Sequence, residues 1–195
     1  MKKIPAILLL IFVYLNPSFA FEKDAENLIQ QTTENAKKII KDSSIKLEDK
    51  KKQIEKIALD VVDVDGLGRF CLGAEIQNLK KDQLDLYKKT FRIFFSKNIS
   101  SRLQNYSDQN IKVSGSKKIS DNYVLVASKM TSIKENREVN IDWRVFNISG
   151  KLVIRDLVVE GLSLAKTQRE EFASILANKG FDGLIANLND FISKN

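Results

Sequence analysis

The chain of 195 residues contains no histidine and a single cysteine, and these two shortages exclude several kinds of chemistry. Without histidine there is no Ser-His-Asp or Cys-His catalysis, the usual general base is missing, and most zinc sites lose a ligand. A lone cysteine cannot form an internal disulfide. Because Phe70 and Leu72 flank Cys71, we interpret it as a small buried apolar residue rather than a nucleophile.

Proline is also scarce, and both prolines lie in an N-terminal stretch typical of a secretory signal peptide. Two lysines precede an apolar run of twelve residues, Ile4 to Leu15, and small residues precede a cleavage point after Ala20. Twelve residues at about 1.5 Å each fall short of a bilayer core of about 30 Å, so we favour cleavage over a retained membrane anchor. We expect residues 1–20 to be removed and residues 21–195 to be exported.

The expected mature chain has 175 residues (195 minus 20), with no internal repeat and no linker rich in Pro, Gly or Ser. This length suits one domain with a sizeable core. Without the two leader lysines the net charge falls from +7 to +5. That mild excess fits an acidic partner or an anionic surface, and it equally fits a lysine-rich proteome. No basic-aromatic motif indicates nucleic-acid binding. We expect a monomer.

Apolar residues at spacings of three and four predict the helical segments. These segments are 24–41, 48–62, a short turn at 64–72, a long helix at 80–106, and two C-terminal helices at 167–178 and 181–192 separated by Gly180. Asn78 is the predicted cap of the long helix, and Asp63 or Asp65 that of the short turn. Thr167, with a glutamate three residues on, has the pattern of a capping box.

Four sequential strands are predicted at 111–116, at 123–131 and in a central hairpin with its turn at Ser149-Gly150. In the first strand of this hairpin, apolar residues from Val139 to Val145 alternate with polar ones. Its register stays open, because a shift of one residue moves every side chain to the other face. The predicted fold class is α+β: a twisted antiparallel sheet of four to five strands, over which helices from both ends of the chain close.

The long helix carries a wide apolar stripe with five aromatic residues: Leu84, Tyr87, Phe91, Phe94, Phe95, Ile99, Leu103 and Tyr106. Such a stripe is typical of an ordinary core face. It also suits the wall of a cavity for an apolar ligand, and the sequence leaves both interpretations open.

Several segments together resemble the MlaC family of exported phospholipid-binding proteins, also called toluene-tolerance auxiliary proteins. They are GLGRFCLG in the N-terminal half, DWRVFNISGKLVIRDLVVEGLSL in the hairpin, TQREEFASIL after it, and the DGLI segment that follows Gly180. The most specific part is the set Asp156, Glu160, Gly161 and Ser163. The likeness covers most of residues 50–190. One departure is Leu152, where the family often has tryptophan.

This resemblance implies a carrier rather than an enzyme, with an NTF2-like-related fold that encloses an apolar cavity for the acyl tails. It also implies no catalytic residue, no metal site and no cofactor, with the bound phospholipid as cargo. Family members shuttle phospholipid through the periplasm between an outer-membrane lipoprotein complex and an inner-membrane ABC transporter complex, and so maintain outer-membrane lipid asymmetry. By position, the candidate lipid-binding residues are Phe91, Phe95, Ile99, Leu103, Tyr106, Val139, Ile141, Trp143, Val145, Leu157, Val159 and Leu162.

Two other functions stay open at this point. An NTF2-like small-molecule enzyme would set an acid in an apolar pocket, and Asp156 with Tyr106 is the pair the sequence offers. A periplasmic chaperone would expose the aromatic helix as a client surface. For Asp156, Glu160 and Ser163 we favour structural roles, in hydrogen bonds of turns and helix caps.

Overall fold

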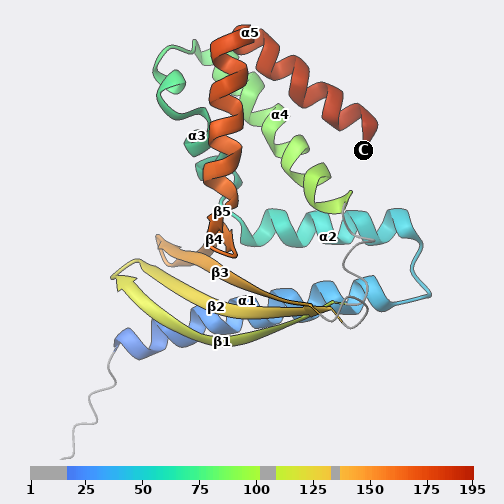
Figure 1. Ribbon diagram of the computed structural model, residues 1–195, viewed down its shortest axis with the longest axis vertical. Coiled ribbons are helices and arrows are strands. Elements are labelled where there is room, and N and C mark those ends of the chain that lie inside the picture. Colours follow the sequence, from blue (N-terminus) through green and yellow to red (C-terminus); the bar gives the residue numbers. More distant parts are fainter. Residues whose placement is uncertain (1–16, 102–108, 133–136) are drawn as a thin grey trace, which may run out of the picture.

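The computed structural model describes residues 17–101, 109–132 and 137–195. The helices are α1 (Pro17–Lys41), α2 (Leu47–Val61), α3 (Val64–Leu72), α4 (Lys81–Ser100) and α5 (Leu164–Lys194), with a 3-10 turn η1 (Gly73–Gln77) after α3. The strands are β1 (Gln109–Ser120), β2 (Tyr123–Ser132), β3 (Arg137–Ile148), β4 (Lys151–Val159) and β5 (Leu162–Ser163). Figure 1 shows the sheet at one end of the molecule, with α1 along it, and α3, α4 and α5 at the other end.

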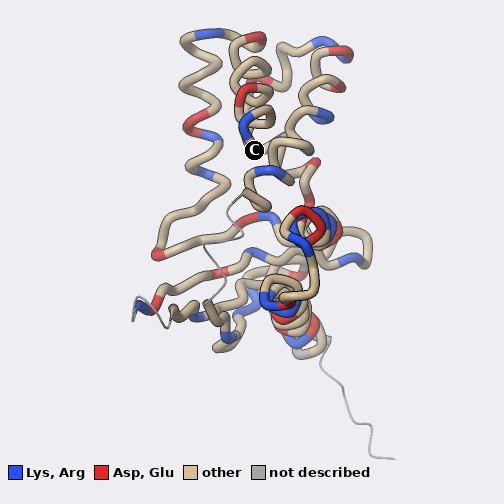
Figure 2. The backbone as a smooth tube through the Cα atoms, turned by 90° about the vertical axis from the view of Figure 1, so that its right-hand side faces the viewer, with Lys and Arg blue, Asp and Glu red and all other residues tan. Residues whose placement is uncertain are grey.

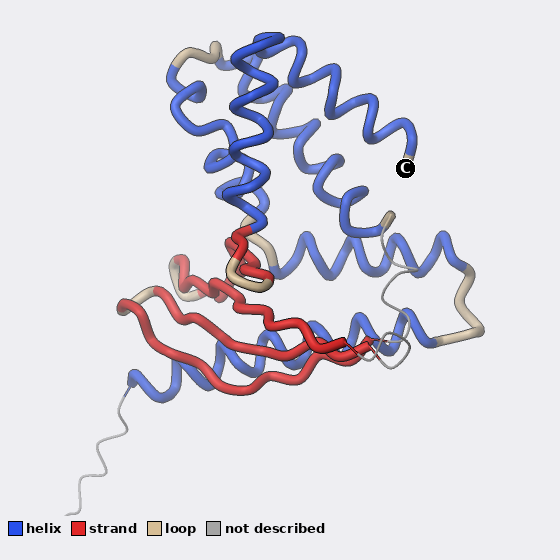
Figure 3. The backbone as a smooth tube through the Cα atoms, in the orientation of Figure 1, coloured by secondary structure: helices blue, strands red, loops and turns tan. Residues whose placement is uncertain are grey.

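The strands form one antiparallel sheet in the order β1-β2-β3-β4-β5, which confirms the predicted α+β class (Figure 3). The structure also supplies the register of the central hairpin: Trp143 of β3 lies between Val126 of β2 and Leu157 of β4. The predicted turn at Ser149-Gly150 is a two-residue loop with φ of 51° and 87°. Both residues are left-handed, as the right-handed twist of the flanking strands requires.

One face of the sheet packs against α1, and the contact forms an apolar core that we call the sheet cluster. Its buried members are Ala25, Ile29, Val124, Val126, Val139, Ile141, Trp143, Val145 and Ile154. Two glutamates of α1 also bind β1. Glu26 Oε1 accepts a hydrogen bond of 2.8 Å from the Ser116 hydroxyl, and Glu22 Oε1 accepts one of 2.8 Å from the backbone N–H of Lys118.

A second apolar core, the helical cluster, holds α3, α4 and α5 together. Its buried members are Val64, Cys71, Leu72, Tyr87, Phe91, Phe94, Phe172, Leu184 and Leu188. The backbone of Gly68 lies so close to Phe91 that a Cβ there would meet the ring at 2.8 Å. This close packing explains why position 68 is a glycine. The Tyr87 hydroxyl donates to the Gly68 carbonyl at 2.9 Å.

The predicted helix ends are correct in part. Asp63 caps α3, since its carboxylate accepts from the backbone N–H of Gly66 at 3.0 Å. Asn78 is not the cap of α4: the N-cap is Lys80, and the Asn78 N–H instead donates to the Glu75 carbonyl at the end of η1. The C-terminal helices meet at Gly180, whose φ of 66° interrupts α5 as predicted.

The start of α5 also differs from the prediction. The N-cap is Ser163, whose hydroxyl accepts from the Lys166 N–H at 3.0 Å, and Thr167 lies inside the first turn. Before the helix, Leu162 and Ser163 pair with β4 as the short strand β5, which the sequence did not predict. Pairing with β4 holds Ser163 where it caps, so α5 begins one turn earlier.

Some predicted elements cannot be compared in full. Strand β1 is twice its predicted length, because a bulge between Val113 and Gly115 lets it continue through the polar residues beyond. Helix α4 ends at Ser100, and residues 102–108 lie outside the described part, as does the turn predicted at Glu135-Asn136. Of the predicted leader, residues 1–16 lie outside it too, and α1 continues across the expected cleavage point. Among the described helices, none combines the length and apolarity needed to cross a membrane.

Candidate functional site

The sheet residues predicted to bind lipid share the face that packs against α1. Val139, Ile141, Trp143 and Val145 are buried, with at most 9% of each exposed. Leu157 and Val159 of β4 are half-buried at the margin of the sheet cluster. These positions alternate along antiparallel strands, so they form a continuous apolar surface.

Leu162 differs from the other sheet candidates because it is 69% exposed. It pairs with Val159 across the β4–β5 turn, so it extends the same face toward the sheet edge. That turn is held by Glu160, whose N–H donates to the Asn140 carbonyl at 3.0 Å and whose carboxylate accepts from the Asn140 N–H. The turn role expected for Glu160 is therefore confirmed.

The predicted residues of the long helix lie in the other core. Phe91 is buried in the helical cluster, where its ring meets Phe172 edge-on at 6.1 Å. Phe95 and Ile99 are half-buried, and Leu103 and Tyr106 lie outside the described residues. The structure thus assigns the candidates of β3 and β4 to the sheet cluster and Phe91 and Phe95 to the helical cluster, while Ile99 and Leu162 belong to neither. Nothing in the sequence indicated this division. With Tyr106 undescribed, its pairing with Asp156 stays a prediction.

The two clusters meet at Val62, which sequence analysis did not single out. This residue follows α2 and packs against both the sheet cluster and the helical cluster. It adopts an extended conformation and forms a β-bridge with Ile154 of β4, next to which the Asp63 N–H donates to the Ile154 carbonyl at 3.0 Å. The VVDV sequence after an amphipathic helix was the available signal, since two adjacent β-branched residues favour an extended strand over a helix end.

A buried polar chain fixes the tryptophan of the sheet cluster. The Trp143 indole N–H donates to the Ser128 hydroxyl at 2.8 Å, and that hydroxyl donates to the Ile141 carbonyl at 3.1 Å. Ser128 is only 2% exposed. Since both buried polar groups have partners, the indole can face apolar surroundings without an unsatisfied donor.

A buried carboxylate joins the sheet to α5. Asp156 is 7% exposed and accepts hydrogen bonds from the Ser163 hydroxyl at 2.6 Å and the backbone N–H of Ala165 at 2.9 Å. Arg144 of β3 lies 3.3 Å from the same carboxylate. A second pair, Arg155 with Asp63 at 2.8 Å, ties β4 to the start of α3. These contacts confirm structural roles for Asp156 and Ser163.

No reactive nucleophile or metal centre emerges from the described residues. Cys71 is 1% exposed, as predicted, and burial raises the pKa of its thiol to about 12. Burial likewise raises the pKa of the Tyr87 hydroxyl above its ordinary value. In the described part of the chain, no three acidic, cysteine or histidine side chains are grouped as metal ligands would be.

Comparison with known proteins extends these observations. The model of the family described as MlaC protein matches residues 30–190. The intermembrane phospholipid transport system binding protein MlaC of Haemophilus influenzae is 26% identical over 140 residues, which are 70% of this chain and 65% of that protein. The toluene tolerance protein ttg2D of Pseudomonas putida is 22% identical over 130 residues, 66% of this chain and 60% of that one. The matches thus span less than two thirds of each relative.

A solved structure shares the fold. The phospholipid-binding protein from Ralstonia solanacearum, determined in complex with a phospholipid, superposes with a TM-score of 0.74 at 19% identity. The likeness covers 87% of this chain and 97% of that one. At this identity the likeness establishes the arrangement of helices and strands.

Proposed function

Because the chain belongs to the MlaC family, we propose that it is a carrier that holds the acyl tails of a phospholipid between the sheet and the helices. In this proposal it acts as a periplasmic monomer after loss of residues 1–20. It moves lipid between an outer-membrane lipoprotein complex and an inner-membrane ABC transporter complex, and so maintains lipid asymmetry. The lipid part of this proposal is supported by two similar proteins, the phospholipid transport system binding protein of Haemophilus influenzae and the phospholipid-binding protein of Ralstonia solanacearum.

The observation that carries the proposal is the meeting of two apolar clusters at Val62. Half-buried apolar side chains also pack against each cluster: Val61 of α2 and Leu157 of β4 against the sheet cluster, and Phe95 of α4 against the helical cluster. Tails inserted beside Val62 would contact side chains that already face apolar neighbours. The insertion would separate the clusters without breaking either of them.

The energetics require a shielded route for the lipid. Each methylene moved into water costs about 0.8 kcal/mol, so a lipid with roughly thirty methylenes costs on the order of 20 kcal/mol. An apolar site in the carrier makes the transfer nearly neutral, and a small bias from a partner then sets its direction. The headgroup should remain at the rim, since burying a phosphate without paired donors costs several kcal/mol.

The described residues of α4 favour a carrier over a chaperone. A client surface for unfolded chains would expose the aromatic side chains, yet Tyr87, Phe91 and Phe94 are at most 7% exposed. For an enzyme, the acid would be Asp156, whose oxygens are engaged by Ser163 and Ala165. Neither alternative draws support from the site.

Native mass spectrometry of the protein exported with its own leader, and purified without detergent, tests the proposal. We expect one phospholipid per chain, identified by solvent extraction of the same sample. A clean apo mass that persists after incubation with phospholipid vesicles would contradict the carrier.

Leu162→Asp is the informative variant for locating the tails. Its side chain is 69% exposed, so folding should be unaffected, whereas a carboxylate on this apolar edge should reduce the lipid load severalfold. Ile119→Asp, at an exposed apolar residue of β1, is the matched control and should load normally. Equal loading of the two variants would remove Leu162 from the site. The buried Trp143 is unsuited to this test, because a carboxylate there would unfold the sheet cluster.

A further inference from the structure

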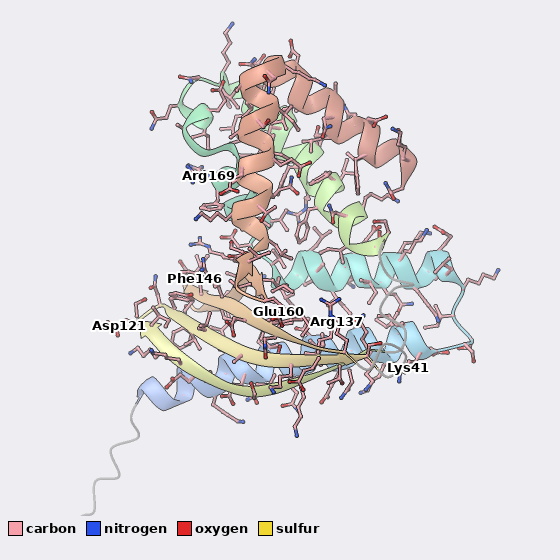
Figure 4. The ribbon with its side chains drawn as sticks, in the orientation of Figure 1. Lys41, Asp121, Arg137, Phe146, Glu160 and Arg169 are labelled. Carbon is pink, nitrogen blue, oxygen red and sulfur yellow. The ribbon has the colours of Figure 1, made fainter. Side chains whose placement is uncertain are left out.

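A groove outside both clusters runs between α3, β3 and the start of α5. It encloses about 500 Å³ and is lined by Phe70, Arg144, Ser163, Lys166, Arg169, Glu170 and Ala173. A second hollow of about 420 Å³ continues it along α5 and shares Arg169 and Ala173 with it. We call the two together the α3–α5 groove. Figure 4 places Arg169 beside α3 and α5, far from Lys41 at the end of α1.

The charges of this groove are largely unpaired. Both signs of charge are spread along the elements of the molecule (Figure 2). Around the first hollow, Lys166 and Arg169 lie near Glu170, while Arg144 is paired with the buried Asp156. Glu75 lines the second hollow. Neither Lys166 nor Arg169 forms an ion pair with a described residue. Arg169 instead lies over the ring of Phe70, 5.0 Å from its centroid. Three cationic side chains against the carboxylates of Glu170 and Asp156 leave the first hollow with an excess of positive charge, which a partner can neutralise.

Its walls offer apolar contact as well. Phe70 is 42% exposed, although it adjoins the helical cluster. Ala173 and Ala177 are exposed and lie one turn apart on α5, where small side chains let another backbone approach closely. Aromatic side chains and arginines are enriched in protein interfaces, and the groove offers both in Phe70 and Arg169.

We propose that the α3–α5 groove docks an acidic segment of a partner protein. An apolar side chain of that segment would rest on Phe70 and Ala173, and its carboxylates would face Lys166 and Arg169. The inference rests on the proposed function, in which the carrier must dock at its two membrane complexes. A protein segment fits better than lipid tails, because cationic side chains border the groove and burying them against hydrocarbon is costly.

Charge reversal in the groove tests the proposal. Lys166→Glu combined with Arg169→Glu should weaken binding to the detergent-solubilised membrane complexes of the source cell by at least about tenfold at low salt, and by less at high salt. Lys112→Glu combined with Lys117→Glu changes the net charge equally at exposed positions of β1 and should bind like the unaltered protein. Arg144 is left intact because it contacts the buried Asp156. Native mass spectrometry should show that both variants keep their phospholipid.

The outcomes separate the docking surface from the carrier. Lost docking with a normal lipid load supports the groove, while unchanged docking, or an equal loss in both variants, overturns it. Failure of the unaltered protein to bind either complex overturns it as well. An empty unaltered protein would contradict the carrier function instead. The variant with Lys166→Glu and Arg169→Glu is also tested against vesicles of phosphatidylglycerol. If it binds these vesicles less well than the unaltered protein but still docks at the membrane complexes, the groove binds lipid and the proposal is overturned.

A photo-crosslinking residue in place of Ala173 identifies the occupant. We expect a crosslink to a segment of a membrane-complex subunit rich in Asp and Glu, absent when the groove charges are reversed. A crosslink to lipid, to a segment without acidic residues, or to nothing contradicts the proposal.

Discussion

Replacement of Asp156 should strongly destabilise the protein, because this carboxylate holds the start of α5 against the sheet. Asp156→Ala removes the acceptor of the Ser163 hydroxyl and of the Ala165 N–H, which lie at 2.6 and 2.9 Å. Hydrogen bonds to a charged group contribute about 1.5–3 kcal/mol each. The ion pair with Arg144 adds at most about 1 kcal/mol, since 44% of that arginine side chain is exposed.

The expected loss in the free energy of unfolding is therefore about 3–7 kcal/mol, a large part of the 5–15 kcal/mol typical of a domain. Asp156→Asn keeps an oxygen for the Ala165 N–H but loses the charge, so it should cost about half as much. Urea denaturation followed by circular dichroism measures both changes. Asp60→Ala, at an exposed position of α2, is the control and should change stability by no more than about 0.5 kcal/mol.

A loss below about 1 kcal/mol for Asp156→Ala would refute this reasoning. It would mean that the junction between the sheet and α5 is held by apolar packing alone, and that Ser163 caps the helix without the help of the carboxylate.

Two further predictions concern the buried polar groups of each cluster. Trp143→Phe removes the indole N–H that donates a hydrogen bond to the Ser128 hydroxyl. The free energy of unfolding, measured by urea denaturation, should fall by about 1–3 kcal/mol. A fall of less than about 0.5 kcal/mol would show that this hydrogen bond is dispensable. Cys71 should resist iodoacetamide at pH 8 until the protein unfolds, because burial raises the pKa of its thiol to about 12. In the unfolded chain the Cys71 thiol has a pKa near 9.0, so above this pH the unfolded state has lost a proton that the folded state keeps. The free energy of unfolding should therefore fall by about 1.4 kcal/mol per pH unit. Cys71→Ala should lack this slope between about pH 9 and 10.

The sequence predicts the elements of this fold well where their signal is local. Alternation from Val139 to Val145 indicated a strand with one apolar face, and that face is the one buried against α1. The helix break at Gly180 and the turn at Ser149-Gly150 were predicted because glycine readily adopts left-handed backbone conformations. The structure shows positive φ at these residues. Each of these signals lies within a few residues of the feature that it specifies.

Features that depend on distant contacts were missed or misplaced. The first turn of α5 depends on Asp156 and on the pairing of β5 with β4, neither of which is visible in the capping pattern at Thr167. Periodicity showed that Phe91 and Trp143 both face an apolar environment, but it does not specify which one. The structure places them in different clusters that meet at Val62, a residue with no periodic signal of its own.

The central claim, that acyl tails lie beside the sheet cluster, can be tested through the only tryptophan in the chain. Trp143 is 8% exposed and belongs to the wall that the tails are proposed to contact. Loading the protein with phospholipid brominated along its tails should strongly quench the fluorescence of Trp143, while lipid without bromine should not. Stoichiometric loading without quenching would contradict the account, because the tails would then lie away from the sheet.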